Sequence, residues 1–142
     1  MTQQQIQIIQ DCIPILQKNG LNLTKEFYKV MFNDYPEVKP MFNMEKQESE
    51  EQPKALAMAI LMAAKNIENL DNIKSFVEKV GVTHLKLGVK KEHYPIVGAC
   101  LLKAIKNLLN PDDETLKAWE SAYSKISQFY IKIEEDLSHK SF

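Results

Sequence analysis

One histidine of this sequence occupies a position where a helix would bury its side chain. The residues Ile73, Val77, Val80, His84 and Leu87 follow one another at steps of three and four, which is the spacing of one face of an α-helix. We therefore expect the imidazole of His84 to point inward. Neutral imidazole is a common metal ligand, but a lone histidine on an apolar face is more often a core residue that hydrogen-bonds a neighbour.

Two further side chains could support a metal ligand at this place. Tyr94 lies in the first turn of the next expected helix, from which its hydroxyl could return toward His84. Glu134 lies at the edge of the inward face of the last expected helix. A carboxylate bonded to the far nitrogen of a metal-bound imidazole orients the ring and raises its basicity. Taken singly, each residue is better explained without a function, Tyr94 as a packing tyrosine and Glu134 as part of a solvated acidic face.

Other candidates carry less information by themselves. Tyr28 follows Phe27, so it can border the core and present its hydroxyl to a cavity, although a boundary tyrosine with its tip in water is an equal alternative. Phe42 comes after a helix-breaking turn, and Gln52 directly precedes Pro53. Singly, these last two positions indicate no function.

The elements that must position these residues are all expected to be helices. The helical period recurs through nearly the whole chain, and no short segment alternates apolar and polar residues as a strand does. The fold class is therefore all-α, in a single domain over residues 1–142. The expected helices cover about residues 2–20, 22–33, 52–70, 71–88, 92–109 and 112–137.

Several helix ends have specific signals. Thr2 and Gln5 form a capping-box pattern, Pro14 should bend the first helix, and Gly20 should end it. Asp71-Asn72 can cap the fourth helix, which Gly88 should end. The polar, acidic stretch 43–51 is expected to be a surface loop.

Charge and composition exclude several classes of function. The formal net charge is -1 and the chain has no arginine, which argues against nucleic acid or an anionic membrane as a main partner. The first residues do not resemble a signal peptide, and no stretch is long and apolar enough to span a bilayer. Cys12 and Cys100 lack the spacing of a zinc site or a redox pair. A cytoplasmic location is the simplest expectation.

Taken together, the order of these residues resembles the globin domain of the flavohaemoglobin family, and most closely its single-domain bacterial haemoglobins. The resemblance covers almost the whole chain and implies a globin fold packed around a buried haem pocket. The stretches that carry it are FYKVMF at 27–32, YPEVKPMF at 35–42, QPKAL at 52–56, HLKLGV at 84–89 and EHYPIVG at 92–98.

On one side of the pocket, the resemblance implies that His84 is the proximal ligand of the haem iron and that Phe42 stacks on the porphyrin. Tyr94 and Glu134 would hydrogen-bond the proximal imidazole and give it partial imidazolate character. Such an electron push favours activating bound oxygen over carrying it.

On the other side, the resemblance implies that Tyr28 and Gln52 are the distal pair that meets bound oxygen, while Leu56 narrows the distal space. The haem would be haem b, because no Cys-x-x-Cys-His stretch is present to attach it covalently.

The implied function is reversible oxygen binding with detoxification of nitric oxide, by dioxygenation to nitrate. The alternatives are oxygen storage or delivery to a respiratory oxidase without catalysis, a sensor, and an all-α interaction module without cofactor. Two-domain members of the family continue into a flavin- and nicotinamide-binding reductase, and Thr83 stands where they commonly carry a lysine near the flavin. We therefore expect a separate electron-donating reductase. Lys86, Lys90 and Lys91 could dock an acidic reductase, although a solvated lysine face is the more common role of such a cluster.

Overall fold

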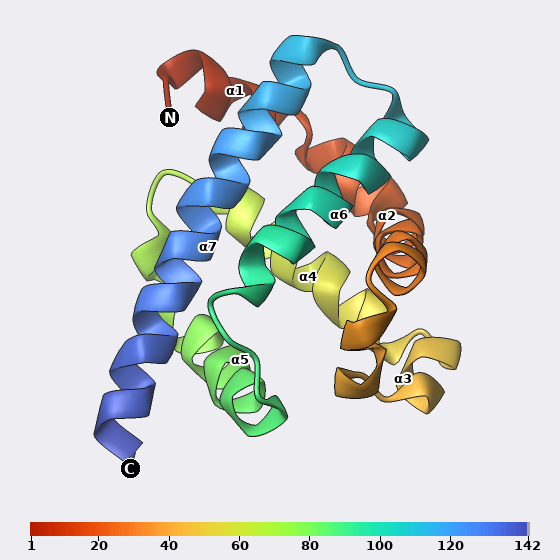
Figure 1. The fold of residues 1–142 in the computed structure, drawn as a ribbon. Helices are drawn as coiled ribbons and strands as arrows, with labels where there is room; N and C mark the ends of the chain where they lie inside the picture. Colours follow the sequence, from red (N-terminus) through yellow and green to blue (C-terminus); the bar gives the residue numbers. More distant parts are fainter. Residues whose placement is uncertain (142) are drawn as a thin grey trace.

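The computed structural model describes residues 1–141, and within them every regular element is a helix (Figure 1). The predicted all-α fold class is thus confirmed, because all the regular secondary structure described is helical. The α-helices are α1 (Gln3–Asp11), α2 (Ile13–Asp34), α3 (Met44–Glu48), α4 (Glu51–Lys65), α5 (Lys74–Leu87), α6 (His93–Leu109) and α7 (Asp113–Ser141), and the 3₁₀ helices are η1 (Pro36–Met41) and η2 (Leu70–Ile73).

The start of the chain forms the predicted cap but divides into two helices. The Thr2 side chain accepts from the Gln5 backbone, and the Gln5 side chain completes the capping box. Pro14 does more than bend the first helix, because α1 ends before it and α2 begins with it in the first turn. Proline has no N–H to continue the hydrogen bonds of α1, whereas its fixed φ suits the first turn of a new helix.

The predicted helix end at Gly20 was wrong. This glycine is buried in the middle of α2, which continues to Asp34. A Cβ built at Gly20 would lie 3.4 Å from the Cβ of Ala57 on α4. Gly20 therefore allows α2 and α4 to pack closely and does not end a helix.

Two other local predictions were also wrong. The stretch 43–51 is not an irregular loop, because the Asn43 side chain accepts from the backbone N–H groups of Glu45 and Lys46 and thereby starts the short helix α3. Asp71 and Asn72 do not cap α5 but lie within η2, and α5 begins after them without a side-chain cap. The predicted end of α5 is confirmed, since Gly88 adopts a left-handed conformation there, with φ 79°.

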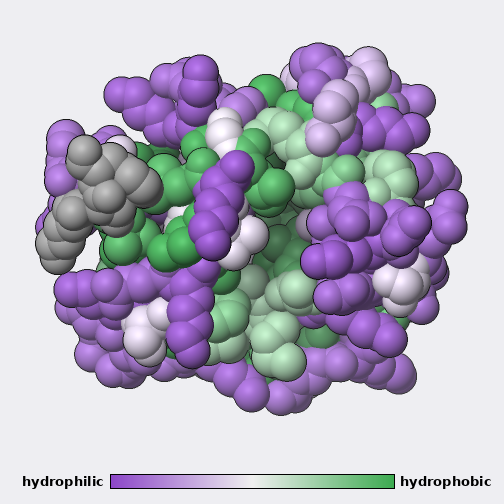
Figure 2. All heavy atoms as spheres, turned by 90° about the horizontal axis from the view of Figure 1, so that it is seen from below, coloured by the Kyte–Doolittle hydropathy of each residue, from purple (hydrophilic) through white to green (hydrophobic). Residues whose placement is uncertain are grey.

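The buried apolar residues form two clusters that α7 connects. The larger cluster joins α1, α2, α4, α6 and the first half of α7, and the smaller one joins α5, η2 and the second half of α7. α5 packs mainly on α7 and η2, and it lies beside the C-terminal half of α7 in Figure 1. The face of the molecule that carries α5 and α3 is hollowed, and apolar side chains line the hollow between polar rims (Figure 2). None of the helices described is long and apolar enough to cross a membrane.

Candidate functional site

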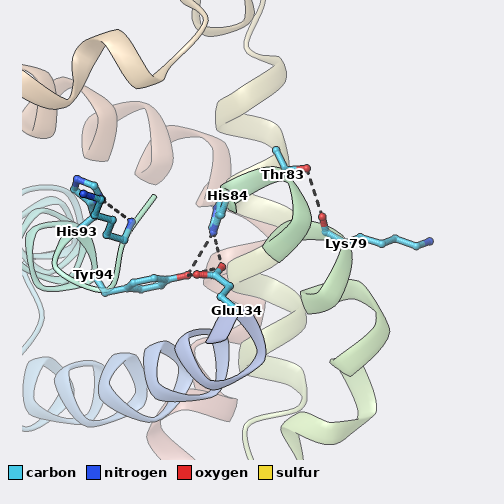
Figure 3. A network of polar contacts seen from close by, with 7 residues as sticks. Lys79, Thr83, His84, His93, Tyr94 and Glu134 are labelled. Carbon is cyan, nitrogen blue, oxygen red and sulfur yellow. Dashed lines mark hydrogen bonds and ion pairs between the residues drawn. The ribbon is translucent and has the colours of Figure 1, made fainter. Parts of the chain in front are cut away.

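The side chains of His84, Tyr94 and Glu134 meet where α5, the start of α6 and α7 come together (Figure 3). Nδ1 of His84 lies 2.8 Å from Oε2 of Glu134. The Tyr94 hydroxyl donates to the same carboxylate, 2.8 Å from Oε1 and 2.9 Å from Oε2, and lies 3.4 Å from Nδ1 of His84. Three residues that are far apart in the sequence thus form one hydrogen-bonded triad.

The triad fixes which nitrogen of His84 can bind a metal. A carboxylate only accepts hydrogen bonds, so Nδ1 carries the proton and the lone pair lies on Nε2. Nδ1 of His84 has two hydrogen-bond partners among the residues described, whereas Nε2 of the same ring has none there. Glu134 is 8 % exposed, whereas the His84 side chain is 29 % exposed. Burial, followed by the negative charge of Glu134, raises the pKa of Tyr94 far above its usual range, so its hydroxyl remains a donor.

Two residues that the sequence did not single out hold the triad in place. A Cβ built at Gly81 would lie 2.9 Å from Cδ1 of Leu137 and 3.2 Å from Cγ of Glu134, so glycine allows α5 to approach α7 at the triad. The Tyr123 hydroxyl donates to the backbone oxygen of Tyr94 at 2.7 Å and ties the start of α6 to α7. A glycine inside a predicted helix was a usable signal for close packing. Tyr123 has no such signal, because it lies on an ordinary apolar stripe.

Tyr28, on α2, packs within a group of aromatic rings. Its ring centroid lies 5.5 Å from that of Phe42 and 5.7 Å from that of Phe32, and the rings of Phe32 and Phe42 lie 5.4 Å apart. Tyr28 is 9 % exposed, and burial raises the pKa of its hydroxyl to about 12. Leu56, on α4, is half-buried against the same apolar cluster. The Tyr28 hydroxyl is thus a neutral donor beside apolar side chains.

Gln52 lies in the first turn of α4, where one hydrogen bond holds the neighbouring backbone and another holds the Gln52 side chain. The buried Thr24 hydroxyl donates to the backbone oxygen of Pro53 at 2.8 Å, which ties the start of α4 to α2. The Gln47 amide, from α3, donates to Oε1 of Gln52. Neither Thr24 nor Gln47 was singled out from the sequence. No direct hydrogen bond joins Tyr28 to Gln52 among the residues described.

No group of three or more His, Cys, Asp and Glu side chains within residues 1–141 is arranged to hold a metal ion. Residues 25–129 match the family model of globins. The chain belongs to the globin family.

The similar proteins agree with this assignment. The globin is similar to a bacterial globin from Campylobacter jejuni, with 78% identity, a TM-score of 0.96 and coverage of 98% of this chain and 100% of that chain. It is also similar to an engineered carbene transferase from Rhodothermus marinus, described as a putative nitric oxide dioxygenase, at 28% identity and a TM-score of 0.89, covering 98% and 96% of the two chains.

Among curated proteins, the globin is 41% identical over 144 residues to a flavohemoprotein of Bacillus thuringiensis subsp. konkukian. The match covers 99% of this chain but 36% of that protein. The globin thus spans about a third of the length of this relative. The resemblance of the sequence to the globin domain of flavohaemoglobins is confirmed.

Globins bind haem, and the residues of this globin fit that group. A haem needs an apolar space and an axial nitrogen whose lone pair is not used elsewhere. The structure has an apolar hollow (Figure 2), and Glu134 leaves the Nε2 lone pair of His84 available. Tyr94 and Glu134 contact this imidazole at Nδ1 (Figure 3), where they can orient the ring without occupying Nε2.

Proposed function

We propose that this globin holds haem b through Nε2 of His84. The Glu134 carboxylate fixes the tautomer that such a ligand requires, because Nδ1–H donates to it. Phe42 and Leu56 supply apolar contacts to the porphyrin, which suits their half-buried places against the larger apolar cluster. The two other histidines are poorer candidates. His93 uses Nδ1 to accept from the Lys90 backbone, and His139 is exposed near the end of α7.

The proposed activity is dioxygenation of nitric oxide to nitrate. When bound, haem supplies oxygen binding and one electron, so one NO and one O₂ give one nitrate and the iron ends in the ferric state. The observation that carries this proposal is the 2.8 Å contact between Nδ1 of His84 and Glu134, with Tyr94 bonded to the same carboxylate. This contact raises the basicity of the imidazole, and a more basic axial ligand favours activation of oxygen over its simple carriage.

On the opposite side of the pocket, Tyr28 and Gln52 are the proposed donors to bound ligand. The Tyr28 hydroxyl is neutral at physiological pH, since the pKa of tyrosine is about 10 even in water. Burial raises this pKa further, to about 12. A fixed donor beside a ligand that gains negative charge stabilises that charge, and surrounding apolar side chains strengthen the effect. Gln52 offers a second donor from the first turn of α4.

The direct test is to mix the oxygen-loaded globin with NO and to measure nitrate and the absorption spectrum together. We expect about one nitrate per haem and complete conversion to the ferric spectrum, since each turnover takes one electron from the iron. Release of oxygen without nitrate would contradict the proposed activity and would favour oxygen storage or delivery to an oxidase.

Repeated turnover requires that a reductase return the electron. We propose that this reductase is acidic and docks on the lysines that follow His84. Lys86 lies on α5, and Lys90 and Lys91 lie in the turn before α6, all three exposed. Leu87 is exposed among them, at 47%, so the surface combines positive charge with an apolar centre. Such a surface steers an oppositely charged partner.

A further inference from the structure

Gln47 contacts one of the two residues proposed to face the ligand, although it lies outside the predicted set. It lies on α3 and is half-buried, and its amide donates to Oε1 of Gln52, in the first turn of α4. One side chain thus links the short helix α3 to the proposed ligand-facing residue of α4.

We propose that Gln47 is a positioning residue of the ligand pocket, which occupies the acceptor atom of Gln52 and leaves its donor group for the ligand. This inference rests on the proposed function, in which Tyr28 and Gln52 face the ligand.

For Gln52, the effect follows from the two ends of a carboxamide. Its oxygen accepts hydrogen bonds and its NH₂ group donates them, so a rotation of the amide exchanges one end for the other. Bound oxygen, which carries partial negative charge, is stabilised by a donor and repelled by a carbonyl oxygen. Because the amide of Gln47 donates to Oε1, the NH₂ group of Gln52 is the end that remains to donate.

The backbone around Gln47 is fixed at both ends of α3. The Asn43 side chain caps the start of the helix, accepting from Glu45 at 2.9 Å and from Lys46 at 3.3 Å. Between α3 and α4, Glu50 adopts a left-handed conformation with φ 66°, and its carboxylate pairs with Lys25 of α2 at 2.9 Å. These contacts hold Gln47 at a set distance from α2 and α4.

The test compares haem-loaded Gln47→Leu and Gln47→Glu with a control, Glu48→Gln, which changes an exposed neighbour on α3. The readouts are the C–O stretching band of the carbon monoxide complex and the oxygen dissociation rate, with circular dichroism to check folding. In Gln47→Leu, we expect a higher, broader C–O band and oxygen release faster by about 2- to 13-fold, the range of one neutral hydrogen bond. In Gln47→Glu the side chain keeps its shape, but its carboxylate can only accept hydrogen bonds. It should therefore attract the NH₂ group of Gln52 and turn the Gln52 oxygen toward the ligand, so that oxygen is released at least as fast as from Gln47→Leu.

A positioning role also predicts that these effects depend on Gln52. In a Gln52→Leu background, Gln47→Leu should lose most of its effect on the rate. The inference is overturned if both Gln47 variants match Glu48→Gln, or if the full effect persists without Gln52. Tyr28→Phe separates this result from the proposed function. Faster release in Tyr28→Phe with none in the Gln47 variants contradicts only the inference, whereas an unchanged rate in Tyr28→Phe contradicts the distal part of the proposed function.

Discussion

Glu134→Gln changes the charge behind the proposed ligand while keeping the size of the side chain. In the structure, the two carboxylate oxygens receive the Tyr94 hydroxyl and Nδ1–H of His84. A glutamine offers one oxygen to these two donors, and its NH₂ group faces the other donor. The hydrogen bond to His84 thus becomes a neutral one or is lost. In both cases, the imidazole donates less electron density to the iron.

The size of the effect follows from hydrogen-bond energies. Bonds to charged groups contribute about 1.5–3 kcal/mol and neutral ones about 0.5–1.5 kcal/mol, so the change removes about 1–1.5 kcal/mol of stabilisation. This stabilisation is larger for ferric than for ferrous iron, because the more electron-rich imidazole favours the higher charge. The midpoint potential depends on the difference between the two oxidation states, so it should rise by at most about 40–65 mV, at 59 mV for each tenfold change in a one-electron equilibrium.

A spectroelectrochemical titration of the haem-loaded globin measures this shift, and resonance Raman spectroscopy measures the iron–histidine stretch. We expect the stretch to move to lower frequency in Glu134→Gln and by a smaller amount in Tyr94→Phe, which keeps the carboxylate. Glu135→Gln is the matched control, since Glu135 is the exposed neighbour on α7. A potential and a stretch that both equal those of Glu135→Gln would refute the reasoning.

Three further predictions concern the distal side, the buried tyrosines and the lysine surface. Tyr28→Phe should speed oxygen dissociation by about 10- to 150-fold in stopped-flow measurements, because a hydrogen bond to a partly charged ligand is lost; an unchanged rate would mean that another group is the donor. Burial raises the pKa of Tyr28 and that of Tyr130 to about 12, so their unfolded forms lose the proton first and the folded state loses stability as pH rises from 10 to 12. Urea unfolding should show a fall of about 1.4 kcal/mol per pH unit for each such tyrosine, and a flat profile would contradict their burial. Reversing the charge at Lys86, Lys90 and Lys91 should slow re-reduction by an acidic reductase, as should added salt, and rates insensitive to both would exclude this docking surface.

The pattern of apolar residues was enough to predict which long segments are helical and the direction of His84, because both depend on local periodicity. The helix ends were predicted less well. Gly20 has the same local signal whether it ends a helix or packs against Ala57, and only the neighbouring helix decides between the two. Asn43 is a capping residue within a polar stretch, so its short helix was indistinguishable from a loop by composition.

For the candidate site, the sequence identified residue types but not their contacts. Glu134 and Tyr94 were ambiguous one by one, and their distance to His84 depends on how α5 and α6 pack on α7. Gln47 was missed because its contact with Gln52 requires the fold of α3, which the sequence did not predict. Periodicity therefore predicts which side chains point inward, whereas tertiary packing decides which of them meet.

Haem titration of His84→Ala tests the central claim most directly. His139→Ala is the control, since His139 is exposed near the end of α7 and is not part of the triad. We expect the unchanged chain and the control to bind about one haem each with a normal Soret band, whereas His84→Ala binds haem weakly or with an abnormal spectrum. Free imidazole should restore the band in His84→Ala, because it can occupy the space that the side chain leaves. Haem binding by His84→Ala with the affinity and spectrum of the unchanged chain would contradict the account.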